Sequence, residues 1–238
     1  IPSGLIELKD ECFLSMDKLR EIIVDSKNKS FIFQNECLFG KTDNNSEIFD
    51  KILFAGCDIK QVNIPSCIKI ISPYAFESCR KLTKVEFEPY SKLQIIERSA
   101  FQYSNIQYIS IPSSVSKICD SAFFICTSLM KVEFEPNSNL QIIERSAFEI
   151  TGIKDFFIPP CLSKIEKRWC IDSYNLNKII ISPKNDNFIF EDGKYLIGKT
   201  DNNSNNYDVL LFTKQSIQDA IIPSFIKRVA PYAFGGCV

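Results

Sequence analysis

Apolar and polar residues follow one short pattern that recurs along most of the chain. In each copy, a leucine or isoleucine is followed three and five residues later by two more apolar residues. Clear copies are Leu82-x-x-Val85-x-Phe87, Ile106-x-x-Ile109-x-Ile111 and Leu129-x-x-Val132-x-Phe134. Alternation of β-branched or aromatic residues with polar ones is typical of a strand with one buried face. The pattern therefore predicts one short strand in each copy.

The copies are regularly spaced. The dipeptide Ile-Pro occurs five times, with its prolines 63, 47, 47 and 64 residues apart. The nine residues Leu93–Phe101 are repeated unchanged at Leu140–Phe148. Four phenylalanines that each follow an alanine lie 25, 22 and 25 residues apart: Phe76, Phe101, Phe123 and Phe148. The unit is therefore roughly 23 residues long, in two alternating forms. Such a unit cannot bury its own apolar face, so successive units must stack, and we expect these phenylalanines to form one buried column.

The unit resembles the BspA type leucine-rich repeat, in which Ile-Pro, Ala-Phe, Cys, Leu and Val follow one another at fixed spacing. The matching residues here are Ile111–Ile118, Ala122, Phe123, Cys126, Leu129 and Val132. The resemblance implies an α/β-type leucine-rich-repeat solenoid that is rich in β-structure and right-handed, with one parallel strand per unit of about 23 residues. It also implies a cell-surface or secreted protein that serves adhesion or host contact in bacteria and parasitic protozoa.

Residues 1–238 are expected to form a single solenoid. Two stretches, 25–61 and 182–220, depart from the simple unit and resemble each other: Phe31–Phe33 recurs 157 residues later, and Gly40–Thr42 recurs 158 residues later. We expect each stretch to be a longer coil that carries a projecting hairpin. The repeat pattern would continue beyond Val238, which predicts that the chain is a fragment of a longer one.

Composition and charge argue against several classes of function. The 28 basic and 29 acidic side chains give a net charge of −1, which offers no basic face to nucleic acid. No apolar run approaches the roughly 18 residues of a membrane-spanning helix, so we expect no direct membrane insertion of this segment. The chain has no histidine, the commonest general base and metal ligand. We therefore expect a non-catalytic protein with neither a cofactor nor a metal.

Two groups of residues could nevertheless suggest chemistry. Gly193–Thr200 has the GxxxxGKT spacing of a phosphate-binding loop, which presents backbone N–H groups ahead of a helix. Here a strand-like Tyr195–Ile197 lies inside the motif and a polar loop follows it, so we interpret the segment as a hairpin. Glu97-Arg98 and Glu144-Arg145 recur in register, which favours a solvent-facing charge ladder over acid–base pairs. A nucleotide-binding enzyme is the remote alternative function, and an intracellular interaction scaffold is the nearer one.

Cysteines and asparagines recur at matching positions. Three of the ten cysteines lie three residues after a repeat phenylalanine, where other units have serine or threonine: Cys79, Ser104, Cys126, Thr151, Ser173 and Cys237. A position shared by these residue types predicts a small buried side chain rather than a disulfide or a metal ligand. Asn44 and Asn202 begin Asn-x-Ser triplets at equivalent places in the two hairpin stretches. They are candidate glycosylation sites in a protein secreted by a eukaryote, and turn residues otherwise.

The candidate binding site follows from strand geometry. The first, fourth and sixth positions of each strand pattern point inward, so the third and fifth point outward. Stacking brings these residues onto one surface: Lys84, Glu86, Tyr108, Ser110, Lys131, Glu133, Asp155, Phe157, Lys178 and Ile180. Exposed apolar residues such as Phe157 and Ile180 favour a binding hot spot, unless the 182–220 hairpin covers them. The expected partner is a protein or glycan ligand on host or neighbouring cells.

Overall fold

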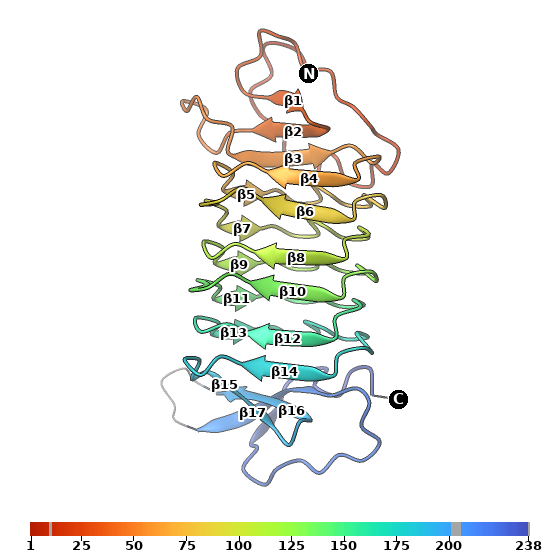
Figure 1. The fold of residues 1–238 in the computed structure, drawn as a ribbon, viewed down its shortest axis with the longest axis vertical. Coiled ribbons are helices and arrows are strands. Elements are labelled where there is room, and N and C mark those ends of the chain that lie inside the picture. The colour runs from red at the N-terminus through yellow and green to blue at the C-terminus, as the bar shows by residue number, and fades with distance from the viewer. Residues whose placement is uncertain (10, 201–205, 238) are drawn as a thin grey trace.

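The computed structural model describes residues 1–9, 11–200 and 206–237 and shows an elongated stack of strands (Figure 1). The eighteen strands, β1 to β18, follow one another along the long axis, and no helix occurs among the described residues. None of these residues belongs to a helix that is long and apolar enough to cross a membrane. The predicted solenoid of stacked parallel strands is confirmed.

Six four-residue strands lie along one side of the stack and are called the front strands: β4 (Gln61–Ile64), β6 (Lys84–Phe87), β8 (Tyr108–Ile111), β10 (Lys131–Phe134), β12 (Asp155–Ile158) and β14 (Lys178–Ile181). They are parallel and pair along their full length in three couples, β4–β6, β8–β10 and β12–β14. Between couples the ladder weakens: β6 pairs with β8 only at Lys84 and Tyr108, and no ladder joins β10 to β12 in the described chain. The 47-residue period of the sequence therefore corresponds to one couple of front strands.

Short strands of two residues form the opposite side of the stack: β5 (Ile70–Ile71), β7 (Ile95–Ile96), β9 (Lys117–Ile118), β11 (Ile142–Ile143) and β13 (Lys164–Ile165). They form one continuous parallel ladder in this order. The second residue of each is a buried isoleucine that faces the core. Each turn of the solenoid thus contributes only two residues to this second sheet. The front strand and the connecting turns contain the rest of the unit.

The predicted phenylalanine column is confirmed. Phe76, Phe101, Phe123 and Phe148 are fully buried, and successive ring centroids are 4.9, 5.2 and 5.2 Å apart. The rings are nearly parallel, with interplanar angles of 9°, 5° and 3°. Parallel rings one turn apart are what the repeat predicts, because equivalent residues occupy the same place in successive turns. The column is the centre of the core.

Antiparallel hairpins lie at both ends of the stack, in the two stretches that depart from the simple unit (Figure 1). The first contains β1 (Ile32–Gln34), β2 (Cys37–Gly40) and β3 (Lys51–Ala55), and the second contains β15 (Phe188–Glu191), β16 (Tyr195–Lys199) and β17 (Tyr207–Thr213). β3 pairs in parallel with β5, and β17 pairs in parallel with β18 (Arg228–Val229). Each hairpin is thereby joined to a two-residue strand of the repeat.

The two hairpins turn in the same way. Asn35 and Glu36 have φ of 50° and 61°, and Asp192 and Gly193 have φ of 51° and 62°. Two successive residues with positive φ are the requirement of a tight hairpin turn, and asparagine and glycine meet it at least cost. The second turn contains one additional residue, Lys194, before β16 begins. That residue explains why the later part of the hairpin recurs at 158 residues rather than 157.

A buried asparagine ties the second hairpin to the turn before it. The Asn185 side-chain amide donates hydrogen bonds to the carbonyls of Pro159 (2.7 Å) and Leu162 (2.8 Å), and its oxygen accepts from the Asn187 N–H. Asn28 makes the same two donations, at 2.7 and 2.9 Å, 157 residues earlier. Asn185 is 8% exposed, whereas Asn28 is half-buried. The side chain thus replaces water at two carbonyls that no strand ladder satisfies.

The predicted small-residue position is also confirmed for five of its six residues, and the sixth, Cys237, is half-buried. Cys79, Ser104, Cys126, Thr151 and Ser173 are all buried on the inner wall, one per turn. Neighbours in the column contact each other: the Ser104 Oγ lies 3.4 Å from the Cys126 Sγ, and the Thr151 and Ser173 hydroxyls are 3.0 Å apart. Burial raises the pKa of the Cys126 thiol to about 12, so it stays protonated. Protonated buried thiols are poor nucleophiles and act here as small packing residues.

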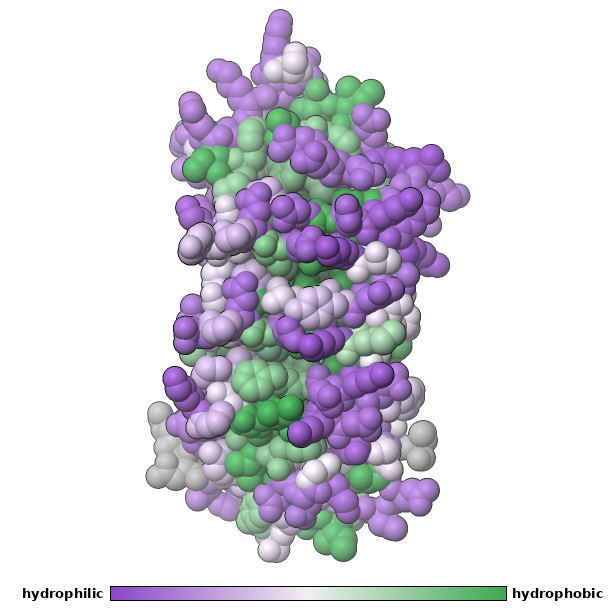
Figure 2. Space-filling model, in the orientation of Figure 1, coloured by the Kyte–Doolittle hydropathy of each residue, from purple (hydrophilic) through white to green (hydrophobic). Residues whose placement is uncertain are grey.

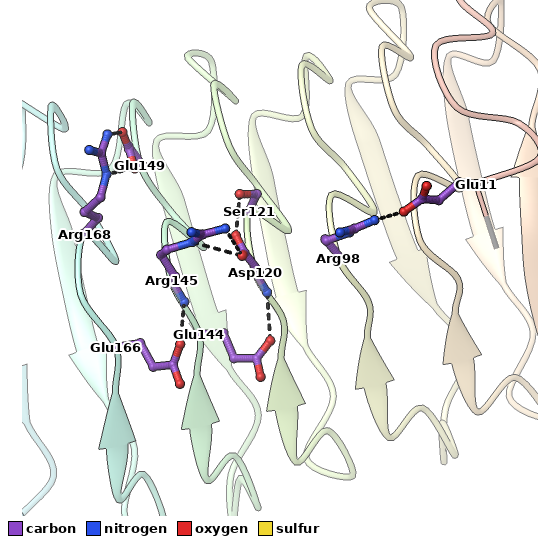
Figure 3. A network of polar contacts seen from close by, with 9 residues as sticks. All are labelled: Glu11, Arg98, Asp120, Ser121, Glu144, Arg145, Glu149, Glu166 and Arg168. Carbon is purple, nitrogen blue, oxygen red and sulfur yellow. Dashed lines mark hydrogen bonds and ion pairs between the residues drawn. The ribbon is translucent and has the colours of Figure 1, made fainter.

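Charged residues along one edge form ion pairs between turns rather than within a dipeptide (Figure 3). Arg98 pairs with Glu11 and not with its neighbour Glu97. Arg145 pairs with Asp120 at 2.6 Å, and Arg168 pairs with Glu149. Arg98 and Arg145 are about half exposed, which fits the expected solvent-facing ladder. The pairs of Arg145 and Arg168 link successive turns, whereas the pair of Arg98 joins a turn to the N-terminal segment.

Candidate functional site

The ten predicted outward residues lie on the exposed side of the front strands, as the first and third residues of β6, β8, β10, β12 and β14. Their pairing places them side by side: Lys131 is opposite Tyr108, Glu133 opposite Ser110, Asp155 opposite Lys178, and Phe157 opposite Ile180. The same face continues onto Gln61 and Asn63 of β4, which were not predicted. The structure thus brings all ten together on one face.

The middle of this face is a network of polar contacts. Lys131 forms an ion pair with Glu133 within β10, and the Tyr108 hydroxyl donates a hydrogen bond of 2.6 Å to the same carboxylate. The Lys131 ammonium also lies 5.8 Å from the centre of the Tyr108 ring. Hydrogen bonds from Lys131, which has the larger effect, and from Tyr108 hold the pKa of Glu133 below its usual value. These groups therefore satisfy one another, and Tyr108 is held in one orientation.

An apolar groove opens next to this network, between β10 and β12, where the ladder is interrupted. Its volume is about 490 Å³. The residues that line it are Met130, Lys131, Val132, Glu133, Lys154, Asp155, Phe157 and Ile180. We call it the β10–β12 groove. Figure 2 shows hydrophobic residues gathered on the lower half of the front face, with hydrophilic residues on both sides.

The side chains in the groove are open to solvent. Met130 is 53% exposed, Ile180 is 40% exposed and Phe157 is half-buried. The alternative in which the 182–220 hairpin covers Phe157 and Ile180 is wrong, because none of its described residues lines the groove. The hairpin instead extends the stack beyond β14 (Figure 1). These apolar residues therefore have no covering element in the described chain.

The repeat itself shows that the groove is not required by the fold. One 47-residue period earlier, Ser110 and Glu133 occupy the positions of Phe157 and Ile180, and Thr83 occupies the position of Met130. β6 and β8 pack with those polar residues in place. The fold thus tolerates both sets of residues, and the apolar set needs an explanation other than stability.

Two groove residues, Met130 and Lys154, were missed by the sequence analysis. Both occupy the second position of the strand pattern, directly before the strand. Only the third and fifth positions were assigned outward in the sequence analysis. The second position is not one of the three inward positions, so it too can face solvent. The signal was therefore present in the pattern.

The Gly-Lys-Thr segment serves the hairpin. A Cβ on Gly198 would lie 2.8 Å from a methyl carbon of Leu211, so a side chain there would push the Leu211 side chain aside. Lys199 lies over the Tyr207 ring at 5.1 Å. Thr200 donates two hydrogen bonds to Asp208, from its backbone N–H at 3.0 Å and its hydroxyl at 2.7 Å. The first hairpin repeats all three interactions with Gly40, Lys41 and Thr42.

Replacing Lys199 with alanine should change the free energy of unfolding by less than about 1 kcal/mol, because a partly exposed cation–π contact contributes little. The parent chain should show no ATP or GTP binding by titration calorimetry. Lys41→Ala is the matched control, since Lys41 has the same contact in a segment that lacks the first glycine. A micromolar Kd that Lys199→Ala alone abolishes would overturn the structural assignment of the motif.

One of the two candidate glycosylation sites lies among the described residues. Asn44 is exposed in the loop between β2 and β3. Asn202 lies outside the described residues. The third Asn-x-Ser triplet begins at Asn28, whose amide nitrogen already donates two hydrogen bonds. Of Asn28 and Asn44, Asn44 is therefore the better acceptor of a glycan.

Comparison with known proteins gives a consistent result. The chain matches the BspA type Leucine rich repeat region family in six copies, over residues 46–177 and 138–238. No curated protein sequence matches it. The pneumococcal vaccine antigen PcpA is similar in structure, with a TM-score of 0.68 and 20% identity over 87% of this chain and 62% of that one.

Two further solved structures are similar in fold. A leucine-rich repeat protein from Eubacterium ventriosum has a TM-score of 0.62 and 18% identity, over 99% of this chain and 57% of that one. A leucine rich cell surface protein from Faecalibacterium prausnitzii has a TM-score of 0.59 and 18% identity, over 87% of this chain and 68% of that one. The chain thus spans less than two thirds of the pneumococcal and Eubacterium chains. At these identities the likeness is one of fold.

Proposed function

Because the chain belongs to the BspA type leucine-rich repeat family, we propose that it is a non-catalytic protein-binding module that uses its front strands. The observation that carries this proposal is the β10–β12 groove. Solvent-exposed Met130 and Ile180, together with half-buried Phe157, lie beside the polar network around Tyr108. A small apolar centre with a polar rim is the usual anatomy of a protein interface, and aromatic side chains at its centre carry much of the affinity.

The shape of the stack suits this role. A solenoid presents many side chains at fixed spacing on a long face, so a partner can contact several turns at once. The front strands keep their outward residues in register within each couple. A partner seated in the groove would therefore also meet the neighbouring turns, and the binding surface extends beyond one pocket.

We place the module at the cell surface or in a secreted protein, where it would serve adhesion or host contact. The name of the Faecalibacterium protein, a leucine rich cell surface protein, supports this location. An intracellular scaffold is the alternative. Antibody labelling of intact cells separates the two: labelling without permeabilisation fits the surface, and labelling only after permeabilisation fits the scaffold.

Replacing Phe157 with serine and Ile180 with glutamate should reduce attachment of the purified chain to host cells or matrix proteins by at least about tenfold, as expected for hot-spot residues. The fold should be unaffected, because Ser110 and Glu133 already occupy the equivalent positions one period earlier. Attachment is measured by surface plasmon resonance or cell adhesion, and the circular dichroism spectrum checks the fold.

Changing Gln61 and Asn63 to serine is the matched control, because these residues lie on the same face three strands from the groove. Attachment that survives the Phe157 and Ile180 changes with an intact fold would refute the front-strand proposal and direct attention to the hairpins. Prior treatment of the target cells with protease or with glycosidase shows whether the ligand is a protein, as proposed, or a glycan.

A further inference from the structure

The strands beside the groove carry lysines without the partners that equivalent lysines have. In β6, Lys84 pairs with Glu86 at 2.8 Å, and in β10, Lys131 pairs with Glu133. In β14 the same first position holds Lys178, but the third position holds Ile180 instead of a glutamate. Lys178 therefore lacks the intrastrand carboxylate that balances the lysines of the other two strands.

Lys154 is a second uncompensated cation at the groove. It is exposed, lines the groove, and forms no ion pair with any described residue, and Lys178 is likewise exposed and without an ion pair there. Of the described acidic residues that line the groove, Asp155 is the one not already paired with a lysine. Two lysines against one aspartate leave the rim of the groove with a positive charge, although the whole chain has a net charge of −1.

One residue contributes both to the apolar surface of the groove and to its unpaired positive charge. The replacement of a glutamate by Ile180 both adds an apolar side chain to the groove and frees Lys178. An apolar surface beside unpaired cations is complementary to an apolar side chain beside carboxylates. The exposed lysines can reach such carboxylates without losing an existing partner, so the charge-assisted hydrogen bonds are not offset by a broken ion pair.

We propose that the β10–β12 groove binds a partner protein segment that has a large apolar side chain flanked by aspartate or glutamate. This rests on the proposed function and specifies its ligand. The apolar side chain contacts Met130, Phe157 and Ile180, and the acidic residues contact Lys154 and Lys178. An uncharged glycan fits less well, because the lining offers few neutral hydrogen-bonding side chains.

Three fluorescein-labelled peptides test the proposal: GEEFEEG, GKKFKKG and GEEGEEG. The whole chain should bind GEEFEEG at least about tenfold more tightly than either of the others, by fluorescence anisotropy. Added salt should weaken this binding, because solvent-exposed charges are screened. Lys154→Gln with Lys178→Gln should remove the preference for GEEFEEG over GKKFKKG. Lys92→Gln with Lys194→Gln, an equal change of charge at two exposed lysines in turns outside the front strands, should preserve it.

The outcomes separate this inference from the proposed function. Equal binding of GEEFEEG and GKKFKKG, a preference that survives the Lys154 and Lys178 changes, or no binding of GEEFEEG at about 1 mM would overturn the acidic ligand. Tight binding of GEEGEEG would do so as well, because it would show a general anion site. If cell attachment still depends on Phe157 and Ile180, the proposed function stands while this inference fails. If attachment does not depend on them, both fail.

Discussion

Replacing Phe123 with alanine should lower the free energy of unfolding by about 3–5 kcal/mol, as for other large-to-small changes in a packed core. Phe123 is fully buried and lies between Phe101 and Phe148, with ring centroids 5.2 Å away on each side. The change therefore leaves a cavity and removes ring contacts with two neighbouring turns at once. Urea denaturation followed by circular dichroism measures the effect.

Phe124→Ala is the control for this experiment. Phe124 is the next residue along the chain, but it is half-buried and contacts only Tyr103 among the aromatic residues described, at 6.1 Å. Its loss should cost less than about 1.5 kcal/mol, since much of its surface is already in water. Similar losses for the two variants would mean that the column does not dominate the stability of the core.

Replacing Asn185 with alanine should destabilise the chain by about 2–4 kcal/mol, because three hydrogen bonds of a buried side chain are lost together. The carbonyls of Pro159 and Leu162 lose their shortest donor, at 2.7 and 2.8 Å, and the Asn187 N–H loses its acceptor. Leucine at this position would fill the space but satisfy none of these groups, so Asn185→Leu should be destabilising as well. Thermal unfolding measured by calorimetry gives both values.

The chain contains its own control for this change. Asn28 makes the same two donations and its oxygen accepts from the backbone N–H groups of Ser30 and Phe31, yet it is half-buried, so water can replace the lost hydrogen bonds. Asn28→Ala should therefore destabilise the chain less than Asn185→Ala does, although it removes one more hydrogen bond. Equal costs would indicate that burial does not set the value of these hydrogen bonds, contrary to the argument made for Asn185.

The sequence predicts those features that follow from its period. The phenylalanine column and the small-residue column need only one assumption, that equivalent residues in successive units stack directly. Alternation then determines which side of each strand faces solvent, which is why all ten outward residues lie where the pattern places them. Neither the two columns nor the outward residues depend on the conformation of the turns.

The groove depends on the turns and was not predicted. The step from Ile109 to Val132 is 23 residues and these strands pair fully, whereas the step from Val132 to Phe156 is 24 and those strands have no ladder. The extra residue is visible in the sequence, but its effect on strand separation depends on backbone angles in the turn. The exposure of Phe157 and Ile180 likewise depended on where the second hairpin lies, and no local pattern records that position.

The coupling of front strands has a genetic consequence. Each couple is a self-contained step of 47 residues, and the identical segments Leu93–Phe101 and Leu140–Phe148 lie one step apart. Unequal crossing-over between DNA copies that encode these segments would delete or insert one whole step, with the reading frame intact. The phenylalanine column would close again over the join, because both edges present the same residues. An inserted step would move the groove further from the first hairpin with its lining unchanged, whereas a deleted step would remove Met130 and put Thr83 in its place beside Phe157 and Ile180.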